Sequence, residues 1–310
     1  MNLLTVDHIT KVYTQRELFH DASFYLQDGE KVGIIGINGT GKSTLLKIMA
    51  GLEEPDAGNV VRANHLVIRY LPQMPEFDPQ KGALENVLSY AQIGSVHQQE
   101  DREEHEKWNL ESNAKSMMTR LGIYNFDEPV GHLSGGQRKR LALVAVLLTP
   151  CDVLLLDEPT NHLDAEMAEW LENYLKGYDK AVVIVSHDRM FLDKVADVTY
   201  EIEYHEMKRY PGNYTYFMQR KQEDLIKQEK DYEEQQKEIK RLTDWIEKWK
   251  NTPTKVAATR SKRMAIEHMV KIEKPRRFDT RAFHGRYTPR IESYTNVIQA
   301  KDLSIGYDAP

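Results

Sequence analysis

Cysteine is nearly absent from this sequence of 310 residues, and no apolar run is long enough to cross a bilayer. Cys151 is the only cysteine, which excludes an intramolecular disulfide and favours a reducing compartment. The longest apolar stretch, 141–148, falls far short of the roughly 20 residues that a membrane helix needs. The N-terminus also lacks the basic and apolar segments of a signal peptide. We therefore expect a cytoplasmic protein with no membrane partner.

The formal net charge of −6 hides an uneven distribution of charge along the chain. Residues 1–206 carry 19 Lys and Arg against 33 Asp and Glu, a balance of −14. Residues 207–290 carry 22 against 12, a balance of +10, and residues 291–310 carry one against three. A basic segment joined to an acidic one indicates a polyanionic partner for the basic segment alone.

A glycine-rich loop, GINGTGKS, occupies residues 36–43 between a strand-like run and a helix-like run. This context is what a phosphate-binding loop requires, because glycines let backbone N–H groups turn toward phosphate oxygens at a helix N-terminus. Lys42 would reach the β- and γ-phosphates, and the Ser43 hydroxyl would ligate Mg²⁺. A glycine-rich turn with an exposed lysine is the simpler alternative. The positions expected to hold the nucleotide are Gly36, Asn38, Gly39, Thr40, Gly41, Lys42, Ser43 and Thr44.

Two buried-strand runs, 153–156 and 182–185, end in residues that suit phosphate hydrolysis. The carboxyl ends of parallel strands are where α/β sheets bind ligands. Asp157 suits Mg²⁺ coordination, Glu158 is placed to polarise an attacking water, and His187 could contact the γ-phosphate. An acidic pair or a lone histidine at a strand end is often structural, but a phosphate-binding loop in the same domain favours the catalytic interpretation.

Two further assignments each depend on a single residue. Gln73 follows the apolar run 66–68 and could reach the metal or the attacking water. Tyr13 could stack on the adenine ring, and core packing is the competing interpretation for this side chain. The phosphate loop, the acidic pair and the histidine together predict that this chain binds ATP with Mg²⁺ and hydrolyses it to ADP and phosphate.

LSGGQ at 133–137, combined with the phosphate loop, resembles the signature of an ATP-binding cassette (ABC) ATPase. DEPTNHLD at 157–164 and SHDRMFLD at 186–193 resemble more narrowly the ABC-F family of soluble tandem-cassette proteins. The resemblance covers residues 1 to about 205 and implies an α/β P-loop ATPase cassette. It also implies that the signature covers an ATP held by a second cassette, in the same chain or in a homodimer. The signature residues are Ser134, Gly135, Gly136 and Gln137.

No glycine or proline occurs from 214 to 250, which predicts a long helix. Apolar residues recur on it every seven positions, which is typical of a narrow packing seam. That seam consists of Leu225, Tyr232, Ile239 and Ile246. A second stripe beside it has Leu242 and Trp249 in the outer half of the helix and Gln228 and Gln235 in the inner half. After a break at 251–254, we expect a second helix from about 255 to 272 that packs back as an antiparallel hairpin.

The tip of the predicted hairpin is basic and has no acidic residue from 248 to 266. Its cations are Lys248, Lys250, Lys255, Arg260, Lys262 and Arg263, with Trp245 and Trp249 beside them. Cations neutralise phosphates and aromatic faces stack on bases, so we expect RNA contact, although the tryptophans could equally pack within the hairpin. In ABC-F proteins the linker at this position enters the ribosome. The resemblance therefore implies ribosomal RNA and P-site tRNA as partners.

The end of the chain repeats the apolar spacing of its beginning. Residues 298–307 match residues 4–13, which predicts the opening strand of a second cassette. We therefore expect an ABC cassette at 1–206, a basic α-helical interdomain linker at 207–290, and the first strand of a truncated second cassette at 291–310. Without a complete second cassette, hydrolysis by this chain is expected to be weak.

Two classes of function compete. The first is an ABC-F ATPase that acts on ribosomes, as a translation factor or as protection against antibiotics. The second is the ATP-binding subunit of a membrane transporter, which would carry the same loop, signature and acidic pair. The basic hairpin, the second-cassette start and the lack of a membrane segment favour the first. A DNA-repair ATPase fits less well, because a coiled-coil insertion there usually interrupts the cassette.

Overall fold

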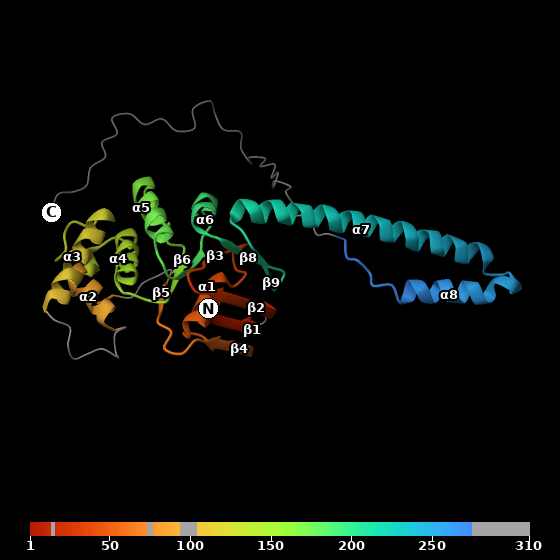
Figure 1. The fold of residues 1–310 in the computed structure, drawn as a ribbon, viewed down its shortest axis with the longest axis horizontal. Helices are drawn as coiled ribbons and strands as arrows, with labels where there is room; N and C mark the ends of the chain where they lie inside the picture. Colours follow the sequence, from red (N-terminus) through yellow and green to blue (C-terminus); the bar gives the residue numbers. More distant parts are fainter. Residues whose placement is uncertain (14–15, 73–76, 94–103, 275–310) are drawn as a thin grey trace, which may run out of the picture. The chain divides into compact units, whose positions relative to one another are not determined.

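The computed structural model describes residues 1–13, 16–72, 77–93 and 104–274. They fall into two compact units, one within Met1–Ile226 and one that begins at Lys227 (Figure 1). Two of the sequence predictions, Gln73 and the strand at 291–310, lie outside the described residues.

The first unit is built on a six-stranded sheet of order β5-β6-β7-β3-β8-β9. Its strands are β3 (Lys31–Gly36), β5 (Ile68–Leu71), β6 (Val153–Asp157), β7 (Ala181–Val185), β8 (Val198–Glu203) and β9 (Glu206–Tyr210). Neighbouring strands are parallel except β9, which runs antiparallel to β8. Every residue of β6 and β7 is buried, because both faces of the sheet are covered.

A second sheet, of order β2-β1-β4, covers one face of the first. It is antiparallel and consists of β1 (Asn2–Tyr13), β2 (Arg16–Gln27) and β4 (Ala57–Arg62). Helix α1 (Lys42–Ala50) contributes to the same apolar core as both sheets. Phe24 of β2 and Tyr200 of β8 join the sheets there, with ring centroids 4.5 Å apart.

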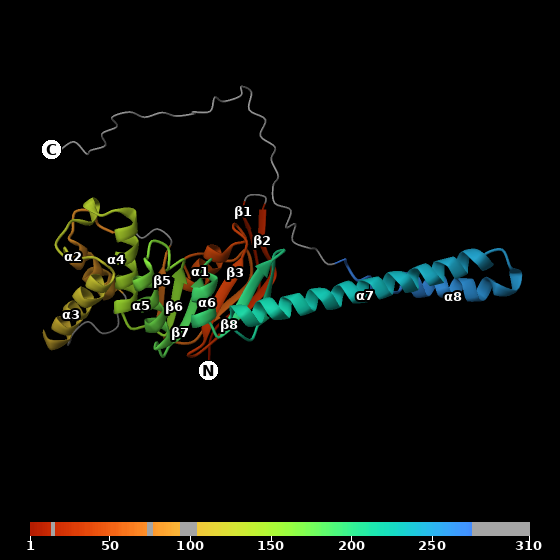
Figure 2. The same cartoon turned by 90° about the horizontal axis from the view of Figure 1, so that it is seen from above.

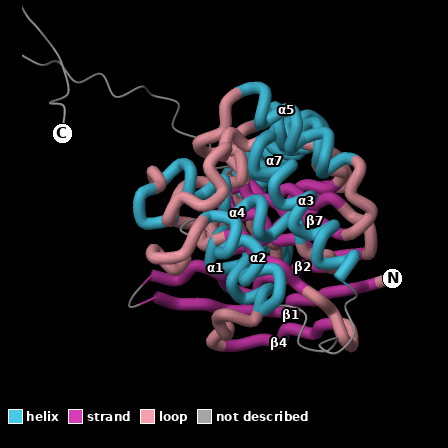
Figure 3. Tube along the Cα trace, turned by 90° about the vertical axis from the view of Figure 1, so that its left-hand side faces the viewer, coloured by secondary structure: helices cyan, strands magenta, loops and turns pink. Residues whose placement is uncertain are grey.

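Helices cover the opposite face of the central sheet (Figure 3). The helices that share the apolar core on this side are α2 (Ala83–Ile93), α3 (Glu104–Arg120), α4 (Gly135–Leu148), α5 (Ala165–Lys176) and α6 (Arg189–Val195), with a 3₁₀ turn at Val130–His132. Helices α2, α3 and α4 gather beside β5 at the edge of the sheet (Figure 2). The apolar run 141–148 is the buried part of α4. Among the described helices, none combines the length and hydropathy needed to cross a bilayer.

The predicted long helix is confirmed as α7 (Tyr214–Trp249), whose 36 residues extend about 54 Å. A 3₁₀ turn at Pro253–Lys255 leads into α8 (Val256–Glu267), which runs back beside the outer half of α7 (Figure 1). The prediction that this second helix continues to 272 is wrong, because helical structure ends at Glu267.

Residues 268–274 return along the inner half of α7 without regular secondary structure. The Gln235 amide nitrogen donates to the Val270 carbonyl at 2.7 Å, and its oxygen accepts from the Ile272 backbone N–H at 2.8 Å. The Gln228 amide donates to the Glu273 carbonyl at 3.1 Å. The two glutamines therefore satisfy backbone groups that a helix would have paired internally.

Candidate functional site

The glycine-rich loop connects the carboxyl end of β3 to the first turn of α1. Gly41 is the N-cap of α1 with φ of 97°, and a Cβ there would lie 2.7 Å from the Phe19 ring. Only glycine fits both the backbone conformation and the space. Among the described residues, no side chain caps this end of α1, so its first N–H groups remain available to an anion.

Lys42, the first residue of α1, is folded across the loop. Its ammonium donates to the carbonyl oxygens of Gly36 at 2.8 Å and Ile37 at 3.1 Å. Burial lowers the pKa of Lys42, while the nearby carboxylates of Glu158 and Asp157 partly raise it. Lys42 in the loop and the two carboxylates therefore lie close enough for their charges to interact, and all three line the same pocket.

Asp157 ends β6 and is only 1% exposed, and Glu158 follows it with φ of 51°, in the left-handed region. Within the described residues, one buried oxygen of each carboxylate, Asp157 Oδ2 and Glu158 Oε1, has no hydrogen-bond partner. Burial raises the pKa of Asp157, and the Ser43 hydroxyl and neighbouring lysines partly lower it. Hard oxygen atoms without partners are the donors that Mg²⁺ prefers, so these residues fit the predicted metal.

His187 lies beside Glu158 because β6 and β7 are adjacent in the sheet. The Glu158 backbone N–H donates to the Val185 carbonyl at 2.8 Å. The His187 backbone N–H donates to Glu158 Oε2 at 3.3 Å, and its Nε2 lies 3.4 Å from Glu158 Oε1. The strand order thus brings together two residues that are 29 positions apart in the sequence.

These residues line one pocket of about 450 Å³. Its lining residues are Tyr13, Leu18, Asn38, Gly39, Gly41, Lys42, Ser43, Thr44, Asp157, Glu158, Asn161, Val185 and His187. Gly36 and Thr40 belong to the loop but do not line this pocket. Asn161 was not predicted, although it lies within the DEPTNHLD segment.

Comparisons with known proteins agree with this geometry. A family profile described as ABC transporter matches residues 19–161, and a second profile with the same description matches residues 200–284. A dimeric ATP-binding cassette solved in a post-hydrolysis state with ADP and phosphate superposes with a TM-score of 0.58. That match covers 67% of this chain and 98% of the solved chain at 23% identity, and therefore shows the fold. The chain contains an ABC ATPase cassette.

Curated relatives match most or nearly all of this chain, and each of them is much longer than the chain itself. The ABC transporter ATP-binding protein YfmR of Bacillus subtilis is 35% identical over an alignment of 272 positions, gaps included, which covers 79% of this chain and 43% of YfmR. The energy-dependent translational throttle protein EttA of Mycobacterium tuberculosis is 32% identical over an alignment of 334 positions, gaps included, which covers 99% of this chain and 59% of EttA. The chain therefore spans about half the length of these relatives.

Tyr13 is an exposed lining residue of the pocket that contains Lys42 and the acidic pair. Its side chain is 44% exposed, so the core-packing interpretation does not fit. The hydroxyl donates to the Glu53 carboxylate, and the Lys11 ammonium lies 5.5 Å from the ring centroid. Adenine stacking by Tyr13 stays a prediction.

The signature of the cassette forms the N-terminus of α4, apart from the pocket that holds Lys42. Ser134 is the N-cap and forms a capping box: its hydroxyl accepts from the Gln137 N–H at 3.3 Å, and its own N–H donates to Gln137 Oε1 at 2.9 Å. Gly135 is exposed, with open space where a Cβ would project. Ser134 and Gly135 are therefore accessible to a ligand that comes from outside this cassette.

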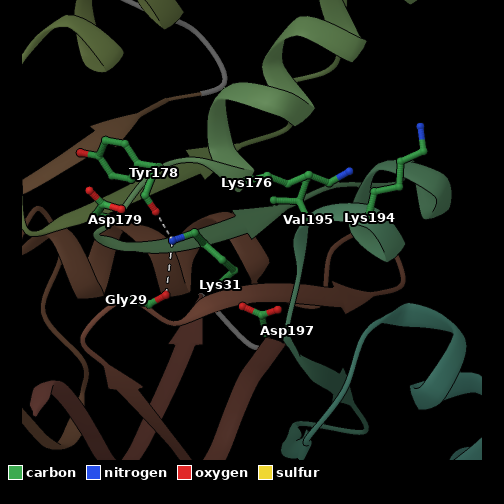
Figure 4. Close-up of a pocket in the computed structure, with 8 residues that line it drawn as sticks. All are labelled: Gly29, Lys31, Lys176, Tyr178, Asp179, Lys194, Val195 and Asp197. Carbon is green, nitrogen blue, oxygen red and sulfur yellow. Dashed lines mark hydrogen bonds between the residues drawn. The ribbon is translucent and has the colours of Figure 1, made fainter.

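A second pocket, of about 390 Å³, lies at the other end of β3 and is less suited to bind an anionic ligand (Figure 4). Lys31 at its base donates to the carbonyl oxygens of Gly29 at 3.3 Å, Tyr178 at 2.5 Å and Lys180 at 2.7 Å. Three acceptors use all three N–H groups of the ammonium, so Lys31 has no donor left for an anion. We interpret it as a structural link between β3 and the segment before β7.

The hairpin tip brings its cations and tryptophans together. Trp245 and Trp249 are half-buried, with ring centroids 6.5 Å apart. Lysine ammonium groups lie against both rings: Lys262 is 4.9 Å from the Trp245 centroid, and Lys248 and Lys255 are 5.5 and 5.9 Å from that of Trp249. This arrangement favours packing of the indoles within the hairpin. The exposed cations are Lys248, Lys250, Lys255, Arg260 and Arg263.

Proposed function

We propose that this chain is part of an ABC-F ATPase that binds the ribosome through the α7–α8 hairpin. The observation that carries this proposal is the direct continuation of an ABC cassette into a helical hairpin with five exposed cations at its tip. The likeness to EttA, which is named as a translational throttle protein, supports a role in translation. Such a protein would work in the cytoplasm.

ATP would bind with its phosphates on the loop and α1. The Lys42 ammonium would exchange its two carbonyl acceptors for β- and γ-phosphate oxygens. The uncapped N–H groups at the start of α1 would donate to the same phosphates. Tyr13, exposed at the pocket mouth, would stack on the adenine.

Hydrolysis would use the acidic pair. Ser43 and Asp157, with Gln73 as predicted, would hold Mg²⁺, which when bound neutralises phosphate charge. Oε1 of Glu158, which lacks a hydrogen-bond partner in the described part of the chain, would accept a hydrogen bond from the attacking water and hold it in line with the γ-phosphate. His187, 3.4 Å from that oxygen, would contact the γ-phosphate from the neighbouring strand.

A second cassette would complete the site. Ser134, Gly135, Gly136 and Gln137 lie away from the pocket of their own cassette. Helix N-termini bind anions, so this end of α4 would cover the γ-phosphate of an ATP on a facing cassette. That cassette would come from the same protein or from a homodimer partner.

The hairpin would meet ribosomal RNA and the P-site tRNA. Its exposed cations suit phosphate contacts, which supply affinity without reading base sequence. The tryptophans, packed against lysines, would then position these cations. We keep the division into a cassette at 1–206, a linker at 207–290 and a second-cassette strand at 291–310 as part of this proposal. The proposal includes two possible roles, regulation of translation and protection of ribosomes from antibiotics.

The test is co-sedimentation of the complete protein with ribosomes through a sucrose cushion. Glu158→Gln should trap the ATP-bound form, so this variant should pellet with ribosomes in ATP and much less in ADP. The double variant Lys42→Ala and Glu158→Gln is the control and should lose the dependence on ATP. Absence of co-sedimentation in every nucleotide state would favour the alternative, an ATP-binding subunit of a membrane transporter.

A further inference from the structure

The segment 158–164, here called the Glu158 loop, joins β6 to α5 and holds two residues in a costly conformation. Glu158 has φ of 51° and His162 has φ of 68°, both in the left-handed region. A side chain with a Cβ crowds the backbone there, so such residues persist only where surrounding contacts hold them. The contacts of the loop therefore identify what keeps it in place.

The first part of the Glu158 loop is held by β7 and by its own turns. The Glu158 N–H donates to the Val185 carbonyl of β7 at 2.8 Å. Within the loop, the Asn161 N–H donates to the Glu158 carbonyl at 3.4 Å, and the Leu163 N–H donates to the Thr160 carbonyl at 3.1 Å. None of these three bonds involves His162, so its conformation depends on another contact.

That contact comes from α4. Arg140 Nη1 donates to the His162 carbonyl at 3.2 Å, across 22 positions of sequence. A Cβ on Gly136 would lie 3.4 Å from the His162 Cβ, at van der Waals distance. Gly136 and Arg140 are four positions apart and share one face of α4, so this face lies against His162. Arg140 Nε is buried and has no hydrogen-bond partner among the described residues, which shows that the side chain is enclosed at this contact.

We propose that Arg140 is a positioning residue for hydrolysis, which holds the Glu158 loop in its left-handed conformation through the His162 carbonyl. Without this bond, His162 would relax and move Asn161 and Glu158, which both line the nucleotide pocket. Small displacements of a group that orients a reactant slow a reaction strongly. Arg140 does not line that pocket, so it acts through the loop and not on the ligand. This inference rests on the role proposed above for Glu158.

Arg140→Met in the 310-residue chain keeps the apolar stem of the side chain and removes the bond. Without nucleotide, hydrogen exchange of the Leu163 amide, followed by NMR, should accelerate on the order of tenfold, because one bond from a charged donor is lost. The single-turnover rate of ATP hydrolysis should fall by up to the same factor. ATP affinity, measured by calorimetry, should not change. Arg140→Gln is the second variant if the methionine variant does not fold.

Replacement of His162 by glycine separates positioning from simple structural support. Glycine adopts the left-handed conformation without the cost that histidine carries. Adding His162→Gly to Arg140→Met should therefore recover roughly two- to fivefold in both exchange and hydrolysis.

Arg138→Met is the matched control on the same helix. Arg138 donates to the carbonyls of Val130 at 3.1 Å and Gly131 at 2.9 Å, which precede α4, and not to the Glu158 loop. Its replacement removes the same charge and bonds of the same kind. Both Leu163 exchange and hydrolysis should stay at their wild-type values.

Three outcomes would overturn the inference. If folded Arg140→Met and Arg140→Gln change neither exchange nor hydrolysis, the bond does not hold the loop. If both change but His162→Gly recovers neither, Arg140 supports only the packing of α4. If Glu158→Gln hydrolyses ATP as fast as the wild type, the proposed role of Glu158 fails and the inference with it, whatever the exchange of Leu163 shows.

Discussion

Gln235 is expected to hold the returning segment of the hairpin to α7. Its side-chain amide makes two hydrogen bonds with the segment: the nitrogen donates to the Val270 carbonyl at 2.7 Å, and the oxygen accepts from the Ile272 N–H at 2.8 Å. Gln235→Leu keeps a good helix former of similar size but removes both bonds. We predict that the segment 268–274 detaches more often, while α7 itself remains helical.

The magnitude follows from the number of bonds. A hydrogen bond contributes about 1 kcal/mol net, so each lost bond should raise local opening roughly fivefold. Hydrogen exchange of the Ile272 amide, followed by NMR, should therefore accelerate about five- to twenty-five-fold. Exchange in the middle of α7 should be unchanged.

Gln236→Leu is the matched control, because Gln236 is exposed on the same turn of α7. It changes the helix propensity and hydrophobicity of α7 by the same amount as Gln235→Leu does, but it removes neither of the two hydrogen bonds to residues 270 and 272. If Ile272 exchanges at the same rate in both variants and in the wild type, Gln235 does not anchor the segment, and our physical reason for its extended conformation fails.

Two further predictions concern the cassette. Glu158→Gln in the complete protein should bind ATP normally but stop turnover at this site, whereas Lys42→Ala should weaken ATP binding by roughly ten- to a hundredfold, because hydrogen bonds to a charged group are lost. Unimpaired turnover by Glu158→Gln with the second site also disabled would contradict the assignment of Glu158. The 310-residue chain should hydrolyse ATP slowly, at a specific rate that rises with protein concentration as cassettes pair. A fast rate that does not vary with concentration, from a chain shown to be monomeric, would exclude this requirement for a second cassette.

The residues that line the proposed nucleotide site could be identified from the sequence because they belong to short, local motifs. The loop needs glycine at a left-handed position such as Gly41, and the apolar runs before Asp157 and His187 identify strands whose ends meet at one edge of a sheet. The burial of Lys139, which is 6% exposed on α4, could not be predicted in this way. Lys139 is the middle one of three successive basic residues in the sequence, and its burial depends on how α4 packs in the cassette.

The hairpin could also be predicted only in part. The long helix α7 was predictable from a run without glycine or proline and from its seven-residue repeat. The end of α8 was not, because 268–272 contains no helix breaker. The relevant information lay in Gln228 and Gln235, polar residues in an otherwise apolar stripe, which pair with the backbone of an extended partner. The reason for these two polar residues is evident only from their tertiary contact with residues 270–273.

The central claim is that the hairpin tip binds ribosomal RNA, and a salt titration tests it most directly. The variant replaces Lys255, Arg260, Lys262 and Arg263 with Ala in the complete Glu158→Gln protein. The control replaces the same number of charges along α7, at Lys227, Lys230, Lys237 and Lys240, all of them exposed. Each lost phosphate contact lowers the slope of log affinity against log salt by about 0.7 to 0.9.

Ribosome binding by the tip variant should therefore weaken, and its slope should be flatter by about 2 to 3 than that of the parent protein, because three of the four replaced cations are exposed. The α7 control should keep the parent's slope. If the tip variant and its parent bind ribosomes equally tightly with parallel salt dependence, the tip makes no phosphate contacts, and the assignment of this protein to the ribosome loses its main support.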